Sequence, residues 1–580
     1  MQIIKSFTKL LVFICPFFAV AQSTYLPQGD KGYHFIDRLE IKQQTNTDLN
    51  YSTLKPFNRK YIVAEAEYID SIAKMNGDNM SADGLNGATG YPKLTNIDRY
   101  NLNSFLMNNT EWVTGSKERF ISKQPILKSF YKTKANLVEV NTKDFFLAIN
   151  PILQLHVGKE RGNDATMFVN TRGVNLRGMI SKKIGFFTSI TDNQERGPGY
   201  FQQRVNDFNA VPGNGFYKKF KNTGVDYFDG RGYITFNAAK YIDVQFGYDK
   251  NFIGNGNRSL FLSDWGNSYL FLKLNTKIWK FNYQNLFMEL TPQFIKTGDT
   301  LLDKKYAAMH HLSINLTKWL NVGLFEGIVF GRKNHFEFQY VNPIIFYRHI
   351  EGTIGSPDNA LAGLDFKANI AHSLQFYGQF LLDEFKIDQI KSNTGWWANK
   401  WGLQLGLKYI DAFTIPNLDL QIESNRVRPF TYSHYSMVAN YTHYNQPLAH
   451  PLGANFQEYI GILRYQPAPR WYINGKIIYY NQGLDSNDVR NRNYGGNIFR
   501  DNAAINRLGG DYGYDVAGGR KATCFNGSLM VSYEVRENLY FELYGQARMF
   551  KVANEPALKD NTTLVTAGIR LNIFKREYDY

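Results

Sequence analysis

Histidines and acidic residues are the first candidates for chemistry in this sequence. His434, His443 and His450 lie close together, but their spacing matches no common pattern of zinc ligands. The segment 485–488 offers carboxylate and amide oxygens, yet it lacks the glycine and the terminal glutamate of an EF-hand loop. We therefore expect loop or rim histidines and solvated carboxylates here, and neither a metal nor another cofactor.

Motifs for nucleophilic catalysis are also missing. Neither GxSxG nor HExxH occurs, so no residue spacing predicts a hydrolytic site. The stretch GNGNRS at 254–259 resembles a phosphate-binding loop, but it lacks the lysine of such loops and no helical pattern follows it. We interpret it as a flexible outer loop and expect no catalytic residues. A lipid or glycan hydrolase embedded in the fold is an alternative.

The stretch TGWWANKW at 394–401 is the best candidate for ligand binding. Flat aromatic faces can stack on sugar rings, and a lysine can pair with an acidic sugar. The alternative for these tryptophans is an aromatic belt at the outer membrane interface. The candidate glycan-contacting residues of the outer rim are Trp396, Trp397, Lys400, Trp401 and Arg258.

The N-terminal 21 residues have the pattern of a secretory signal peptide. Lys5 and Lys9 precede an apolar run at 10–18, and Ala19-Val20-Ala21 fits a small-x-small cleavage site. Removal of this leader leaves Cys524 as the one cysteine, so no intramolecular disulfide is possible.

The composition indicates an exported β-protein. Aromatic residues make up 16% of the chain, with 38 Tyr and 44 Phe. Mean hydropathy is −0.38, and no later segment is apolar enough for a membrane helix. These features fit a transmembrane β-barrel, and the alternative is a large soluble secreted β-protein. The charge of +15, or +13 without Lys5 and Lys9, favours lipid head groups or acidic polysaccharide over nucleic acid, with ordinary solvation as the alternative.

Two kinds of periodicity divide the chain. The segment 59–75 has apolar residues at helical spacing, and Thr95 with Asp98 predicts the start of a second helix. From about residue 144 the period changes to two, as in WGLQLGLKY at 401–409. The expected divisions are a signal peptide at 1–21, an N-terminal helical periplasmic or plug segment at 22–140, an outer-membrane β-barrel at 141–574 and a C-terminal tail at 575–580.

Alternating segments predict an all-β, antiparallel transmembrane barrel of about 18 strands. Short links alternate with long ones, which places tight turns and both termini in the periplasm and long loops outside the cell. Trp279, Trp319 and Trp471 fall beside short links, as an aromatic girdle requires. The closing strand is 562–574, with Val565 towards lipid and Arg570 towards the lumen. Phe574 should lie at the inner interface, and the tail KREYDY should lie in water.

Several longer segments resemble a known family. They are GYDKNFIGNGNRSLFLSD (247–264), YVNPIIFYRHIEG (340–352), HPLGANFQE (450–458), VNTRGVNLRGMISKKIGFFTSITDNQ (169–194) and KANLVEVNTKDFFLAINP (134–151). Together they resemble the Wzi-like capsule-assembly outer-membrane proteins, and most closely the gliding-motility RemB group. The resemblance implies an eighteen-stranded barrel with a helical periplasmic segment. Ile253-Gly254-Asn255-Gly256 stands where Wzi-like proteins carry Trp-Gly-Pro-Gly, so no sugar-contacting residue is transferred.

The expected function is therefore that of a non-enzymatic outer-membrane barrel at the cell surface. It would act in polysaccharide binding and assembly or in gliding motility. The alternative is a passive diffusion channel for small polar solutes. Expected partners are outer-membrane lipid and lipopolysaccharide, surface polysaccharide, and proteins of a gliding or secretion machinery, but no nucleic acid.

Overall fold

A computed structural model describes residues 23–44, 48–77, 94–294, 300–332, 335, 337–344, 346–485, 493–574 and 576–580. The expected signal peptide lies outside these residues. None of the described helices is long and apolar enough to cross a membrane.

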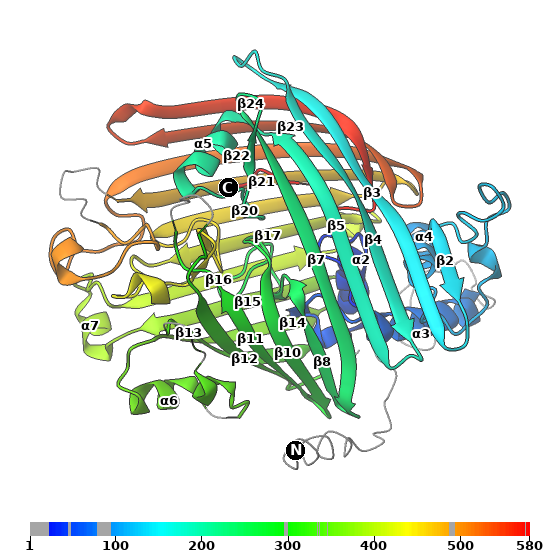
Figure 1. The fold of residues 1–580 in the computed structure, drawn as a ribbon, viewed down its shortest axis with the longest axis horizontal. Coiled ribbons are helices and arrows are strands. Elements are labelled where there is room, and N and C mark those ends of the chain that lie inside the picture. The colour runs from blue at the N-terminus through cyan, green and yellow to red at the C-terminus, as the bar shows by residue number, and fades with distance from the viewer. Residues whose placement is uncertain are drawn as a thin grey trace, which may run out of the picture.

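Eighteen strands of the described chain form one closed antiparallel barrel, which confirms the predicted fold (Figure 1). They are β3 (Phe145–Glu160), β4 (Met167–Ile180), β5 (Ile184–Arg196), β7 (Gly224–Ala239), β8 (Ile242–Asp249), β10 (Tyr269–Ile278), β11 (Phe281–Leu290), β12 (Lys305–Asn315), β13 (Leu320–Phe330), β14 (Asn359–Ile370), β15 (Leu374–Glu384), β16 (Lys400–Tyr409), β17 (Leu418–Val427), β20 (Phe456–Tyr465), β21 (Trp471–Leu484), β22 (Arg520–Arg536), β23 (Leu539–Val552) and β24 (Glu555–Leu571).

The other elements are short strands and helices. Strand β1 (Leu54–Lys55) pairs with β9 (Phe252–Ile253), β2 (Val138–Asn141) with β3, β6 (Lys218–Phe220) with β7, and β18 (Thr442–His443) with β19 (Gln446–Pro447). The α-helices are α2 (Gly32–Gln43), α3 (Arg59–Gly77), α4 (Asn96–Met107), α5 (Gly199–Phe208), α6 (Tyr347–Thr353) and α7 (Ile387–Ser392). Single 3₁₀ turns are η1 (Leu49–Tyr51), η2 (Glu118–Phe120), η3 (Phe338–Val341), η4 (Ala412–Thr414), η5 (Met437–Ala439) and η6 (Ala504–Asn506).

The barrel closes where its last strand meets its first. Strand β24 pairs with β3 from Leu564 opposite Glu160 to Leu571 opposite Leu153. Lipid cannot hydrogen-bond an open sheet edge, so this closure is what a membrane requires. Along β24, Val565 is exposed on the lipid side, whereas Arg570 faces the lumen and pairs with Glu542 at 2.7 Å. Both orientations confirm the predicted alternation.

The two ends of the barrel differ as predicted. Tight turns such as Ser181–Lys183 join neighbouring strands at one end, and Trp279, Trp319 and Trp471 lie exposed beside such turns. Long loops with α5, α6 and α7 lie at the other end (Figure 1). We call these the inner end and the outer end, because outer-membrane barrels place tight turns in the periplasm.

The N-terminal helices lie at the inner end. Helices α2, α3 and α4 pack around one apolar core, which contains Phe35, Val63, Leu102 and Leu106. The predicted helix start at Thr95 is confirmed, because Thr95 and Asp98 form a capping box at α4. Helix α2 lies inside the ring of strands (Figure 1), which places its polar face against the lumen wall.

Candidate functional site

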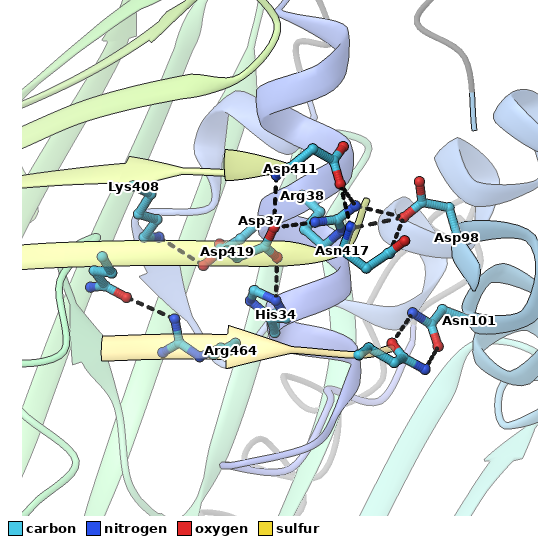
Figure 2. Close-up of polar contacts among 12 residues, drawn as sticks. His34, Asp37, Arg38, Asp98, Asn101, Lys408, Asp411, Asn417, Asp419 and Arg464 are labelled. Carbon is cyan, nitrogen blue, oxygen red and sulfur yellow. Dashed lines mark hydrogen bonds and ion pairs between the residues drawn. The ribbon is translucent and has the colours of Figure 1, made fainter. Parts of the chain in front are cut away.

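A polar network fastens α2 to the inside of the barrel (Figure 2). Arg38 is almost fully buried and forms ion pairs with Asp98 of α4, Asp411 of a turn and Asp419 of β17. Burial alone would lower the pKa of Arg38, but these three carboxylates raise it above its usual value. The guanidinium therefore stays charged and joins two helices to the wall.

The spacing of basic residues in α2 explains this docking. His34, Arg38 and Lys42 are each four positions apart, so they share one helical face. His34 lies 2.8 Å from Asp419, and Lys42 lies 2.6 Å from Asp98. Burial would raise the pKa of Asp98, but Arg38 and Lys42 lower it to about 2. The sequence offered this spacing, but the acidic partners lie far along the chain, with Asp98 56 positions from Lys42 and Asp419 381 positions from Arg38.

The wall supplies two further cations to α2. Lys408 of β16 contacts Asp37 at 2.7 Å, and Lys367 of β14 contacts Glu40 at 2.5 Å. Helix α2 is therefore held from several strands at once and fills the inner part of the lumen.

The C-terminal tail also lies in the lumen, so its expected place in water is wrong. Arg576 contacts the fully buried Glu195 at 2.7 Å, and Asp579 contacts Lys476 at 3.0 Å and Arg258 at 3.4 Å. The ring of Tyr580 stacks edge-on with Trp265. Opposite charges on the lumen wall explain why this charged tail folds inwards. Lys575 lies outside the described residues.

Phe574 is a related correction. It was expected at the inner membrane interface, but it packs in the lumen against the backbone of Gly29. The guanidinium of Arg231 lies 5.8 Å from its ring centroid. The chain turns inwards after β24, so Phe574 enters the lumen together with the tail.

The outer end of the lumen is closed by two long loops. Residues Leu260, Phe261 and Leu262 of one loop and Tyr432 and Tyr441 of the other join a buried apolar core with the barrel wall. The ring of Phe261 stacks on Phe325 of β13 with centroids 4.5 Å apart. The stretch 254–259, expected to be a flexible outer loop, is thus packed inside the barrel.

Between α2, the tail and the two loops lies a chamber of about 740 Å³. Thirteen lysine and arginine side chains and eight aspartate and glutamate side chains line it among the described residues. The net positive lining agrees with the basic charge of the chain. Residues of α2 and of the tail are both part of its lining.

The predicted tryptophans lie in an outer cluster formed by three loops. Trp396 and Trp397 are partly exposed, and Arg507 lies 3.9 Å from the ring centroid of Trp397. Phe430 packs edge-on against Trp397. We call Trp396, Trp397, Phe430, Arg507 and Tyr514 the outer aromatic cluster.

Arg428 holds the outer aromatic cluster together. Its guanidinium donates to the carbonyls of Asn399 at 2.7 Å, Trp396 at 3.2 Å and Tyr514 at 3.0 Å. It thus joins the three loops that follow β15, β17 and β21. Arg428 and Arg507 were not predicted, because no local pattern shows that these loops meet.

Three predicted contact residues lie elsewhere. Lys400 is fully buried, and its ammonium donates to the carbonyl of Ser433 at 3.0 Å. Arg258 is buried in the lumen beside Asp579, so its expected place on the outer rim is wrong. Trp401 lies on the lipid side of β16, with Arg426 5.9 Å from its ring centroid. That position fits the alternative of an interfacial belt.

The three histidines each brace a loop. His443 accepts from the backbone of Thr291 at 3.0 Å, and His450 lies 2.7 Å from Glu458. Burial lowers the pKa of His434 and of His443 to about 4, so both are neutral near pH 7. No cluster of three metal-binding side chains occurs in the described part of the chain. Asn487 and Asp488 lie outside that part.

These features define the protein as a closed outer-membrane β-barrel whose lumen holds a helix, the tail and two loops. The model of the family "Capsule assembly protein Wzi" matches residues 222–526, more than half of the chain. The protein belongs to this Wzi family. No curated protein matches the sequence.

The solved structure of Escherichia coli Wzi shows the same fold. Wzi of Escherichia coli, an outer-membrane protein involved in group 1 capsule assembly and a carbohydrate-binding β-barrel, is 11% identical. The match covers 95% of this chain and 100% of that one, with a TM-score of 0.54. OprD of Pseudomonas aeruginosa is 9% identical over 73% of this chain and 94% of that one, with a TM-score of 0.38. OccAB2 of Acinetobacter baumannii is 9% identical over 73% and 97%, with a TM-score of 0.39.

Proposed function

We propose that this barrel holds polysaccharide at the cell surface and takes part in assembling a capsule-like layer. The observation that carries the proposal is the outer aromatic cluster, which presents partly exposed Trp396 and Trp397 at the outer end. Aromatic faces stack on sugar rings. Arg507 packs on Trp397 and pairs with Asp511 at 2.7 Å, so it holds this ring in place. Family membership and the carbohydrate-binding property of the Escherichia coli protein support the same role.

Polysaccharide binding by the purified barrel tests this proposal. The Trp396→Ala and Trp397→Ala variants should each bind an acidic capsular polysaccharide about tenfold more weakly, because each loses one stacking surface. Trp471→Ala is the matched control, because Trp471 is exposed at the inner end. Equal binding by all three variants would contradict the assignment of the site.

The alternative is a passive diffusion channel. It requires an open lumen, whereas α2 and the tail lie inside the lumen and two loops pack across its outer end. Conductance in planar bilayers separates the two functions. Large steady conductance by a barrel that ignores polysaccharide would favour the channel.

We further propose that the retained glycan serves gliding motility. This finer role rests on the resemblance of segments 134–151 and 169–194 to the RemB group. A deletion strain scored separately for surface glycan and for spreading on agar tests it. Lost glycan with normal spreading would leave the polysaccharide role and remove the gliding role.

A further inference from the structure

The loop between β13 and β14 folds over the outside of the barrel. Helix α6 of this loop lies outside the ring of strands in Figure 1. Tyr347 of α6 stacks on His310 of β12 with ring centroids 4.0 Å apart, and the backbone of Arg348 donates to Glu326 of β13 at 3.0 Å. We call the described residues of 337–354 the lateral flap.

The wall under the lateral flap is polar. His310 and Glu326 alternate with lumen-facing His311 and Phe325, so they point away from the lumen. Asn285 pairs in register with His310, and His310 with Glu326, so the three form a row across β11, β12 and β13. Polar groups of this kind are costly against hydrocarbon. The flap removes them from that contact.

The inner side of the lateral flap matches this row. Tyr347 and Glu351 are four positions apart on α6, and both are buried against the wall side. The Tyr283 hydroxyl donates to the carbonyl of Pro343 at 2.6 Å. The side of the flap towards the barrel therefore carries aromatic and polar groups.

The outer side of the lateral flap is apolar. Ile344 is 83% exposed and Phe346 is 75% exposed. On the adjacent wall, Leu324 and Leu364 are register partners and are also exposed on the lipid side. A loop that hides polar groups and exposes large apolar ones has the opposite arrangement to a loop in water.

We propose that the lateral flap binds the acyl chains of outer-membrane lipid through Ile344 and Phe346. The apolar outer side continues the lipid-facing wall at Leu324 and Leu364, which is why lipid rather than protein is the partner. Arg348, whose side chain is 71% exposed, lies next to this surface and can meet a lipid phosphate. The inference depends on the barrel's membrane location and not on polysaccharide binding.

Depth-dependent quenching in liposomes tests the proposal. Phe346→Cys is made in a Cys524→Ala background, labelled with an environment-sensitive fluorophore and reconstituted at full length. Leu324→Cys is the lipid-facing comparison, and Tyr512→Cys, half-exposed in the loop after β21, is the water-facing one. Labels at 346 and 324 should be quenched alike by doxyl-labelled phosphatidylcholine and protected from iodide.

Two results would overturn the proposal. Quenching of the 346 label by iodide, as at residue 512, would place the flap in water. Protection from both quenchers would indicate a protein contact such as a second copy. Ile344→Cys provides an independent position, and heat-modifiable gel migration shows that each variant is folded.

Discussion

Arg576 and Glu195 lie 381 positions apart in the sequence, yet their side chains meet at 2.7 Å inside the barrel. Glu195 is fully buried. Burial by itself would lower the pKa of Arg576, but the carboxylate of Glu195 raises this pKa above its usual value. The pair ties the tail to strand β5. It is one of several contacts that hold the tail and α2 inside the barrel lumen.

Arg576→Ala should strongly destabilise the barrel. Glu195 would keep a buried charge without its partner, which costs about 3–5 kcal/mol. Urea unfolding in liposomes measures the loss. Arg172→Ala is the control, because its pair with Asp192 is more than half exposed and should contribute less than about 1 kcal/mol. If Glu195→Gln did not restore part of the stability of Arg576→Ala, the ion pair would not be the cause.

Docking of the N-terminal helices should depend on pH through Asp98. Its pKa is lowered to about 2 in the folded protein, against roughly 4 in an unfolded chain. A lowered carboxyl pKa stabilises the fold above the unfolded value. This stabilisation is therefore fully present above about pH 4 and is lost as pH falls towards about 2. Protease cleavage of the helices against pH measures it, and Asp98→Asn should flatten the profile.

Cys524 reports on closure of the outer end, because it is buried in the apolar core with Tyr441. Tyr441→Ala removes a buried ring, at about 3 kcal/mol, and should raise the maleimide labelling rate of Cys524 by about 100-fold through local opening. Tyr512→Ala, at an exposed position, should leave the rate unchanged. Rapid labelling of the unmodified protein would show that the outer end is open.

Arg428→Ala should loosen the three loops of the outer aromatic cluster, because three carbonyls lose their shared charged donor. Limited proteolysis of intact cells should then cut these loops faster. Arg426→Ala is the matched control, since Arg426 is exposed at the end of β17, two positions before Arg428. Equal cleavage of the two variants would remove Arg428 from this role.

Much of the barrel could be predicted because its determinants are local. Period-two alternation at 401–409 or in β24 responds to lipid on one side and a polar lumen on the other, and each of these two strands shows it independently. The capping box at Thr95 is a contact over three positions. The tight turns could be predicted because they separate successive alternating segments, and the tryptophans lie beside those turns.

Local patterns in the chain therefore predicted a closed outer-membrane barrel of about eighteen strands, with helices on its N-terminal side. Tertiary structure decided what fills it. Arg576 meets Glu195, Arg38 meets Asp419, and Arg258 turns inwards to Asp579 because barrel closure brings distant wall positions around one lumen. Periodicity shows only which side of a strand a residue faces. The pairing of charges across a lumen depends instead on the arrangement of all the strands in the closed barrel.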